Sequence, residues 1–473
     1  MAYSAYDRAV IRTRKQNLAL AAALVGAAAT VIGPAGPATL TAIAPAQQTA
    51  LTADERAQAQ AQTPLSPDER QLATFVEANN ADALTMVERA VNINSGSMNF
   101  DGVRQVGAMF RKEFDALGFK TEWIDGAAWN RAGHLIATHA GPGRKILLIG
   151  HLDTVFERDS PFQKFEKIDA GHAKGPGITD MKGGDVIMIH ALKALKSIGA
   201  LDRMNVTVVM TGDEESTGRP LARARDALVE AAKGAAVAIG FENGDGDPAH
   251  AVVARRGTTS WRLETTGVTG HSSQVFGADL GSGAIYEAAR IVNAFREKLA
   301  GEPHLTFNPG VFLGGTSVEF DAAVSGGTAA GKTNVVPAKT VVAGDLRALT
   351  PQQFDKAMNT MRAIVKESLP KTSATITFDE GYPPLAPIAG NEQLLVMYDR
   401  ASRDLGLGAV TAVSPDKAGA ADVSFVAGHV PMIIDAVGMK GRDDHSPSET
   451  ADLGSLPIQT KRAAVLLLRL MSR

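Results

Sequence analysis

The sequence contains no cysteine among its 473 residues, so disulfides, thiolate metal sites and a cysteine nucleophile are all excluded. Any metal ion must therefore be bound by His, Asp and Glu. An excess of either charge is also missing, because 48 Lys and Arg stand against 51 Asp and Glu, for a formal net charge of -3. That balance gives no reason to expect a nucleic acid as partner.

Long apolar runs are scarce too, and the one near the N-terminus, residues 18–32, is short for a membrane span. Basic residues precede it and small residues at 44–46 follow it, which is the order of parts in a secretory signal peptide. We predict a signal peptide over 1–46, a linker over 47–65, and a periplasmic or secreted protein. The alternative is an uncleaved N-terminal anchor, and we expect no other membrane contact.

Hydrophobic residues make up 45% of the chain, and its length indicates two or three domains. Apolar runs at 145–150, 205–211 and 237–241 lack polar alternation, as in strands buried on both faces. Helical patterns at 185–195 and 220–232 alternate with them. This order predicts an α/β domain with a largely parallel sheet and helices on both faces.

The pattern changes in the middle of the chain, where residues 258–265 alternate between apolar and polar side chains. Here we predict a smaller α+β unit, inserted into the first domain. The predicted boundaries are 66–255 for the first part of the catalytic domain, 256–370 for the inserted unit, and 371–473 for the second part of the catalytic domain.

Residues that can carry chemistry follow the predicted strands. His151 and Asp153 come directly after the strand at 145–150, and residues two apart on an extended chain point to the same side. Asp180 lies in the glycine-rich segment 174–184, where glycines let the backbone turn sharply. Each pattern alone also fits a structural alternative: a His in a buried turn, or a tight loop with a capping Asp.

Carboxylates gather after the later strands. Asp213, Glu214 and Glu215 are adjacent; a buried cleft tolerates such a run only with cations, whereas a solvated turn tolerates it without them. Glu242 ends another apolar strand, and His445 lies far along the chain. Because strand ends share one edge of a parallel sheet, we expect these side chains to converge. Oxygen and imidazole ligands without sulfur suit two divalent ions.

These motifs occur in an order and at spacings that resemble one family of enzymes, from about residue 66 to the end of the chain. The chain is similar to the glutamate carboxypeptidase (carboxypeptidase G type) branch of the aminoacylase, dipeptidase and succinyl-diaminopimelate desuccinylase family of co-catalytic dizinc hydrolases. The resemblance implies two Zn²⁺ per subunit, with Co²⁺ or Mn²⁺ as substitutes.

The resemblance also implies a role for each metal ligand. Asp180 would bridge both ions. His151 and Glu242 would complete one site. Glu215 and His445 would complete the other. In relatives the peptide bond that follows the bridging Asp is cis.

Further roles follow from the same resemblance. Asp153 would orient the first histidine ligand, and Glu214 would be the general base. In the inserted unit, which would be the lid and dimerisation domain of a homodimer, His271 would stabilise the oxyanion. Asn334 would bind substrate. Arg347 would hold the free carboxylate of the substrate, because its planar guanidinium binds carboxylates in a bidentate manner.

Gly419 matches a loop near the substrate backbone, although Ala418 and Ala420 depart from the family pattern there. The function implied is dizinc hydrolysis of the amide bond before a C-terminal amino acid, in a peptide or an N-acyl amino acid, with glutamate as one candidate. An aminoacylase or dipeptidase of the same family is the alternative, followed by a non-catalytic exported protein that binds peptide or metal. We assign Arg255 and Arg256 to a hinge or surface turn.

Overall fold

The computed structural model describes residues 63–471. The predicted signal peptide (1–46) and all but the last three residues of the predicted linker (47–65) lie outside the described residues. Across residues 63–471, no helix combines the length and the apolar character that crossing a bilayer requires.

The central feature is a six-stranded sheet with the order β1-β2-β6-β3-β7-β16. Its strands are β1 (Lys120–Asp125), β2 (Gly133–His139), β3 (Lys145–His151), β6 (Asn205–Thr211), β7 (Val237–Gly240) and β16 (Ile433–Ile434). The run from β6 through β3 and β7 to β16 is parallel, and β2 is antiparallel to both of its neighbours. The predicted largely parallel α/β fold is therefore confirmed.

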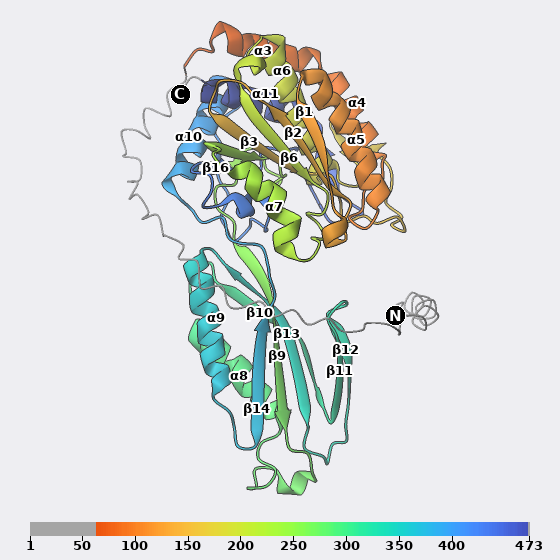
Figure 1. The fold of residues 1–473 in the computed structure, drawn as a ribbon, viewed down its shortest axis with the longest axis vertical. Helices are drawn as coiled ribbons and strands as arrows, with labels where there is room; N and C mark the ends of the chain where they lie inside the picture. The colour runs from red at the N-terminus through yellow and green to blue at the C-terminus, as the bar shows by residue number, and fades with distance from the viewer. Residues whose placement is uncertain (1–62, 472–473) are drawn as a thin grey trace, which may run out of the picture. The chain divides into compact units, whose positions relative to one another are not determined.

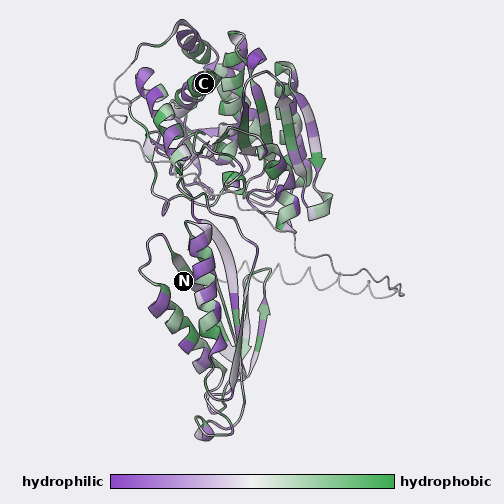
Figure 2. Ribbon diagram, turned by 60° about the vertical axis from the view of Figure 1, so that its left-hand side comes forward, coloured by the Kyte–Doolittle hydropathy of each residue, from purple (hydrophilic) through white to green (hydrophobic). Residues whose placement is uncertain are grey.

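Strand β3 shows why the sheet lacks polar alternation. Ile146 and Leu148 belong to one hydrophobic core, whereas Leu147 and Ile149 belong to a second core on the opposite face. Both faces are thus covered, as expected for a parallel sheet. Figure 2 shows hydrophobic residues along much of the central strands, whereas hydrophobic and hydrophilic residues alternate along the helices.

Helices cover the two faces unequally. The helices that contribute to the first core are α3 (Pro67–Ala78), α4 (Asn80–Val91), α5 (Phe100–Leu117), α6 (Gly183–Ser197), α10 (Ala389–Asp404) and α11 (Ser455–Met471). Helix α7 (Leu221–Ala232) packs on the second core (Figure 1). The helix ends follow local signals: Ser66 forms a capping box with Glu69, and Gly118 ends α5 in the left-handed conformation.

Short strands frame the loops beyond the main sheet. They are β4 (Glu166–Lys167), β5 (His172–Lys174), β17 (Gly441–Arg442) and β18 (Thr450–Asp452), which form a small four-stranded sheet, and the pair β8 (His250–Ala251) and β15 (Thr411–Ala412). The pairing of β18 with β5 joins segments that are distant in the sequence.

A separate antiparallel sheet with the order β10-β13-β9-β14 forms the inserted unit. Its elements are β9 (Gly257–Gly267), α8 (Ala284–Leu299), β10 (Thr306–Gly315), the hairpin β11 (Ser317–Asp321) and β12 (Gly326–Ala330), β13 (Lys339–Ala348), α9 (Pro351–Lys366) and β14 (Thr372–Phe378). Helices α8 and α9 share a core with this sheet that includes Trp261, Leu263, Phe295 and Met361.

The inserted unit extends beyond residue 370, where we predicted its end. Strand β14 pairs along its whole length with β9, so the last strand of the unit reaches Phe378. The sequence signal is weak because β14 places only Ala374, Ile376 and Phe378 against the core and alternates them with hydroxyl side chains. The other predicted domain boundaries remain predictions.

Candidate metal centre

The first ligand group is built on neighbouring parallel strands. His151 is the last residue of β3, and Glu242 lies two residues beyond the end of β7. The two strands pair with Ile149 opposite Gly240, so both side chains leave the same edge of the sheet. His151 Nε2 lies 3.6 Å from Glu242 Oε1 and 3.0 Å from Asp180 Oδ1.

The second ligand group is built on loops. His445 Nε2 lies 3.0 Å from Asp180 Oδ2 and 3.1 Å from Glu215 Oε2. Within each group the potential ligand atoms all lie within 4.8 Å of one another. Asp180 belongs to both groups and presents one oxygen to each. The structure therefore brings together all five residues that we predicted as metal ligands.

The loop that carries Asp180 turns sharply, as its glycines predict. Gly177 has a φ of 71°, in the left-handed region that favours glycine, and the Asp180–Met181 peptide bond is cis. Helix α6 begins at Gly183, immediately beyond the loop. The side chain of Asp180 is thereby directed from the loop toward both histidines.

Asp153 is buried next to the first ligand group and contacts residues of both ligand groups. Its Oδ1 lies 3.5 Å from His151 Nδ1 and accepts a hydrogen bond from the backbone N–H of Glu214. Its Oδ2 accepts hydrogen bonds from the backbone N–H of Glu215 and from the Ser97 hydroxyl. The backbone oxygen of Asp153 lies 3.1 Å from His151 Nδ1, which leaves Nε2 to face the centre.

The electrostatics of the cluster fit divalent cations. Burial and the charge of Asp180 raise the pKa of Glu215 to about 7 and also raise the pKa of Glu242. Hydrogen bonds to Asp180 and Glu215 raise the pKa of His445 to about 11. Glu215 Oε1 is buried and finds no hydrogen-bond partner among residues 63–471. Buried carboxylates that repel one another, with an oxygen left unpaired, are stabilised by positive ions.

Glu214 lies beside the centre without being a member of either group. Burial, and after it the charges of Asp422 and Glu215, raise the pKa of its carboxyl well above the usual range. Its carboxylate makes no hydrogen bond to another residue of the described chain, whereas its backbone N–H and C=O are both bonded. The backbone of Glu214 is thus fixed while its carboxyl group is available to exchange a proton.

The predicted residues of the inserted unit are not brought to the centre. His271 Nδ1 lies 2.8 Å from Ser273 Oγ, and the carbonyl of Asn334 accepts a hydrogen bond from the adjacent Ser272 N–H. Arg347 lies on β13, pairs with Asp345 and leaves 39% of its side chain exposed. Within residues 63–471, no hydrogen bond or ion pair joins these three residues to a metal ligand.

Gly419 is linked to the centre through two other residues. Its carbonyl oxygen accepts a hydrogen bond from Arg255 Nη1 at 2.7 Å, and Arg255 also pairs with Asp435. Asp435 Oδ1 in turn accepts a hydrogen bond from the backbone N–H of Glu242. Arg255 is 4% exposed, so its assignment to a hinge or surface turn is wrong in respect of the surface; its backbone pairs with Leu385, where the chain returns from the inserted unit.

Sequence reasoning missed a buried network on the far side of Glu214. Arg225 pairs with Asp213 at 2.7 Å and with Asp422 at 2.8 Å, and it donates a hydrogen bond to the Tyr382 hydroxyl. That hydroxyl donates to the backbone carbonyl of Glu214. The one available signal was an arginine on the inner side of an amphipathic helix, which is unusual without a buried partner.

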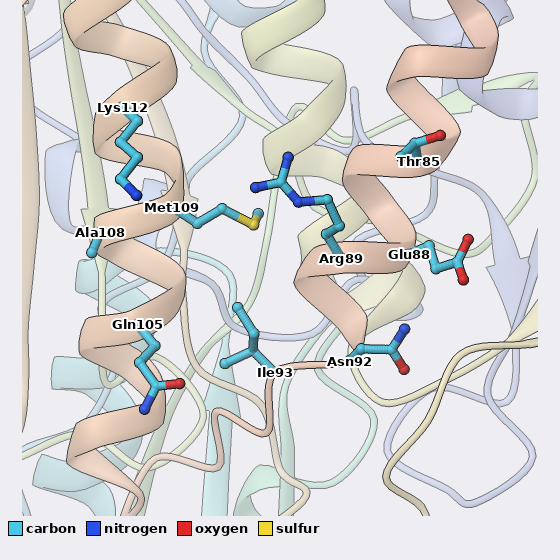
Figure 3. Close-up of a pocket in the computed structure, with 9 residues that line it drawn as sticks. All are labelled: Thr85, Glu88, Arg89, Asn92, Ile93, Gln105, Ala108, Met109 and Lys112. Carbon is cyan, nitrogen blue, oxygen red and sulfur yellow. The ribbon is translucent and has the colours of Figure 1, made fainter.

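A hollow of about 640 Å³ lies elsewhere, between α4 and α5 (Figure 3). Figure 3 shows Met109 and Arg89 extending into the space between the two helices, with Ile93 below them. None of the predicted site residues lines this hollow.

Comparison with known proteins places the chain in a family of peptidases. Residues 147–469 match the model of the family described as peptidase family M20/M25/M40. Carboxypeptidase G2 from Pseudomonas sp. strain RS-16 is 26% identical over 391 residues, which cover 81% of this chain and 88% of that protein. A succinyl-diaminopimelate desuccinylase from Magnetococcus marinus is 25% identical over 376 residues, which cover 72% of this chain and 88% of that protein.

Solved structures share the fold. Aminopeptidase PepT from Bacillus cereus superposes with a TM-score of 0.65 at 20% identity, over 84% of this chain and 99% of its own. The M20 family metallo-carboxypeptidase Sso-CP2 from Sulfolobus solfataricus superposes with a TM-score of 0.60 at 15% identity, over 83% of this chain and 99% of its own.

Proposed function

The chain belongs to peptidase family M20/M25/M40, and from that premise we propose that it is a dizinc carboxypeptidase that hydrolyses the amide bond before a C-terminal amino acid. The observation that carries the proposal is the pair of ligand groups that share Asp180. The similarity to carboxypeptidase G2 over most of both chains favours a carboxypeptidase, with glutamate as one candidate for the released residue.

We propose that His151 and Glu242 hold one zinc ion, that Glu215 and His445 hold the other, and that Asp180 bridges them. The donor set consists of imidazole and carboxylate groups, which also accept Co²⁺ or Mn²⁺. When bound by these residues, two such ions would supply Lewis-acid chemistry: they would polarise the scissile carbonyl and lower the pKa of a water molecule.

Glu214 acts as the general base in this proposal. Its carboxyl oxygens accept a proton from the attacking water and then return it to the nitrogen of the leaving amine. The free carboxyl group and the fixed backbone of Glu214 support this role, because the group can change its protonation without breaking a hydrogen bond. Asp153 keeps His151 oriented meanwhile.

The inserted unit supplies the remaining groups. His271 donates a hydrogen bond to the oxyanion, Arg347 binds the free carboxylate of the substrate, and Asn334 also binds substrate. Gly419, which belongs to the catalytic domain, contacts the substrate backbone. Because His271 and Arg347 form no hydrogen bond or ion pair with the metal ligands within residues 63–471, we propose that closure of the unit, or a partner subunit, brings such groups to the substrate.

The decisive test is Glu214→Gln. The variant should bind zinc as the wild type does but lose about 100-fold or more of its turnover, because the amide cannot accept the proton. Glu230→Gln, an exposed glutamate on α7, is the control and should retain full turnover. Near-normal rates for Glu214→Gln would remove Glu214 from the role.

Metal removal tests the cofactor. Dialysis against a chelator should abolish the hydrolytic activity, and addition of Zn²⁺ or Co²⁺ should restore that activity. Full activity after verified removal of the metal would contradict the proposal.

The substrate is tested with a mixed library of peptides and N-acyl amino acids, with the products identified by mass spectrometry. Release of C-terminal residues from longer peptides supports the carboxypeptidase. Cleavage of N-acyl amino acids or dipeptides alone identifies an aminoacylase or dipeptidase, which the same centre can serve.

We further propose that the protein is exported and forms a homodimer through the inserted unit. Strand β10 is the outer strand of its sheet, and an unpaired edge is a template for association. Beside it, Phe312 and Tyr286 are exposed, and a largely apolar hollow of about 400 Å³ separates α8 from β10. Sedimentation velocity tests the dimer, and N-terminal sequencing of the mature protein tests the export.

A further inference from the structure

Glu449 is a buried carboxylate that receives an unusual set of hydrogen bonds. Its side chain is fully shielded from solvent. Oε1 accepts hydrogen bonds from the Thr179 N–H at 2.8 Å, from the Thr179 hydroxyl at 2.9 Å and from the Asp180 N–H at 3.2 Å. Oε2 accepts one from the Gly177 N–H at 2.8 Å. Among residues 63–471, no lysine or arginine forms an ion pair with it.

These contacts join the two segments that carry the shared ligand and the exposed histidine. Glu449 directly precedes β18, and β18 pairs with β5, with Thr450 opposite Lys174. The chain runs from β5 forward to Asp180, and from β18 backward to His445. Both segments therefore leave one strand pair and are rejoined near the centre by the Glu449 side chain.

The hydrogen-bond donors around Glu449 suit a carboxylate, whose two oxygens can both accept. Several backbone N–H groups of one tight loop converge on it, and a charged acceptor makes shorter and stronger hydrogen bonds than a neutral one. An apolar side chain would leave these buried donors unpaired, which is costly. A glutamine would keep one acceptor oxygen and turn its NH₂ group toward a backbone N–H.

We propose that Glu449 is a positioning residue of the metal centre, because its carboxylate fixes the backbone of Asp180 relative to His445 so that one aspartate can serve both ions. The inference rests on the proposed two-metal function. Glu449 itself touches neither substrate nor metal; it acts through Asp180. Removing its charge should therefore weaken metal binding more than it weakens the fold.

The test compares Glu449→Gln with Glu287→Gln. Glu287 is an equally buried glutamate of the inserted unit, where it accepts hydrogen bonds from Arg290 and from the Leu369 N–H. Zinc binding is measured by calorimetry on the metal-free proteins, and Tm is measured with and without zinc. Glu449→Gln should bind zinc about 10- to 100-fold more weakly, the usual effect of losing a group that orients a ligand.

The zinc-induced rise in Tm separates positioning from folding. Both variants should have a lower Tm than the wild type without metal, but only Glu449→Gln should also show a smaller rise on adding zinc. An undiminished rise and wild-type zinc affinity in Glu449→Gln would overturn the inference and leave the proposed function intact. A wild type that binds no zinc would overturn both.

Glu449→Asp serves if the glutamine variant does not fold. It keeps the charge but shortens the side chain by one methylene, so the carboxylate cannot reach all of its donors. Zinc affinity below that of the wild type supports the inference, and wild-type affinity overturns it.

Discussion

The two halves of the centre use the same ligand types but hold them differently. In the first half, His151 ends a central strand and has 1% of its side chain exposed. In the second half, His445 lies on a loop in the left-handed backbone region and has 55% of its side chain exposed. The histidine of the first half is part of the core, whereas the histidine of the second half lies at the surface beside Glu215, whose side chain is only 5% exposed.

The second ring nitrogen of each histidine shows the same contrast. His151 Nδ1 faces the backbone oxygen and the carboxylate of Asp153. His445 Nδ1 has no hydrogen-bond partner among residues 63–471. A histidine whose other ring nitrogen is held by a hydrogen bond is oriented before the metal arrives, and it binds the metal more tightly. In the proposed two-metal centre, the half that contains His151 should therefore retain its ion more tightly than the half that contains His445.

The largest expected effect distinguishes the halves directly. His445→Ala should retain one metal ion per chain after dialysis, because the buried group stays complete. His151→Ala should retain neither, because it leaves only the exposed group and removes a hydrogen-bond partner of Asp180. Metal content is measured by plasma mass spectrometry.

The opposite order of metal retention in the two variants would contradict the difference that we infer between the two halves. If His151→Ala kept one ion and His445→Ala kept none, the exposed loop would be the tighter site. Both variants should lose turnover, so activity alone does not decide between these outcomes.

A smaller effect is expected from Asp153→Asn, because Asp153 touches both halves. The amide group can no longer accept every hydrogen bond that the carboxylate accepts, so zinc affinity should fall about 10- to 100-fold. Ser97→Ala is the matched control: it removes one hydrogen bond to the same carboxylate and leaves its charge in place. Equal losses in both variants would show that packing, and not the charge of Asp153, matters.

The ligands of the buried half could be predicted from the sequence because the pattern that places them lies in the neighbouring residues of the chain. An apolar run such as β3 predicts a strand covered on both faces, and a histidine at its end predicts a place on the sheet edge. The same reasoning gave the α/β architecture and placed Glu242 beside His151, since neighbouring parallel strands share that edge.

Other features depend on contacts between distant segments and have no local pattern. Glu449 reaches a loop about 270 residues earlier, and nothing in its neighbourhood distinguishes it from a surface glutamate. Arg225 is buried between two carboxylates, and one of them, Asp422, lies far along the chain. For the groups of the inserted unit, such as His271, the sequence predicts roles, and the structure shows no hydrogen bond or ion pair between His271 and a metal ligand among residues 63–471.

The smallest expected effect concerns Tyr382, which contacts the loop of the second half. The Tyr382 hydroxyl donates to the backbone carbonyl of Glu214 and accepts from Arg225, so it steadies the loop that carries Glu214 and Glu215. The bond to the Glu214 carbonyl is a neutral hydrogen bond, which contributes about 1 kcal/mol, so its loss in Tyr382→Phe should lower kcat roughly fivefold with little change in KM.

The matched control is Tyr398→Phe, which also removes one hydroxyl from a buried tyrosine, there bonded to Gln459 away from the centre. Both variants should lose similar stability in thermal unfolding, but only Tyr382→Phe should lose kcat. The loop has to present Glu214 at a fixed place, and the Tyr382 hydroxyl holds its backbone together with the Asp153 carboxylate. If the two variants have the same kcat, the loop keeps its position without the hydroxyl, and the open half is stiffer than its exposure indicates.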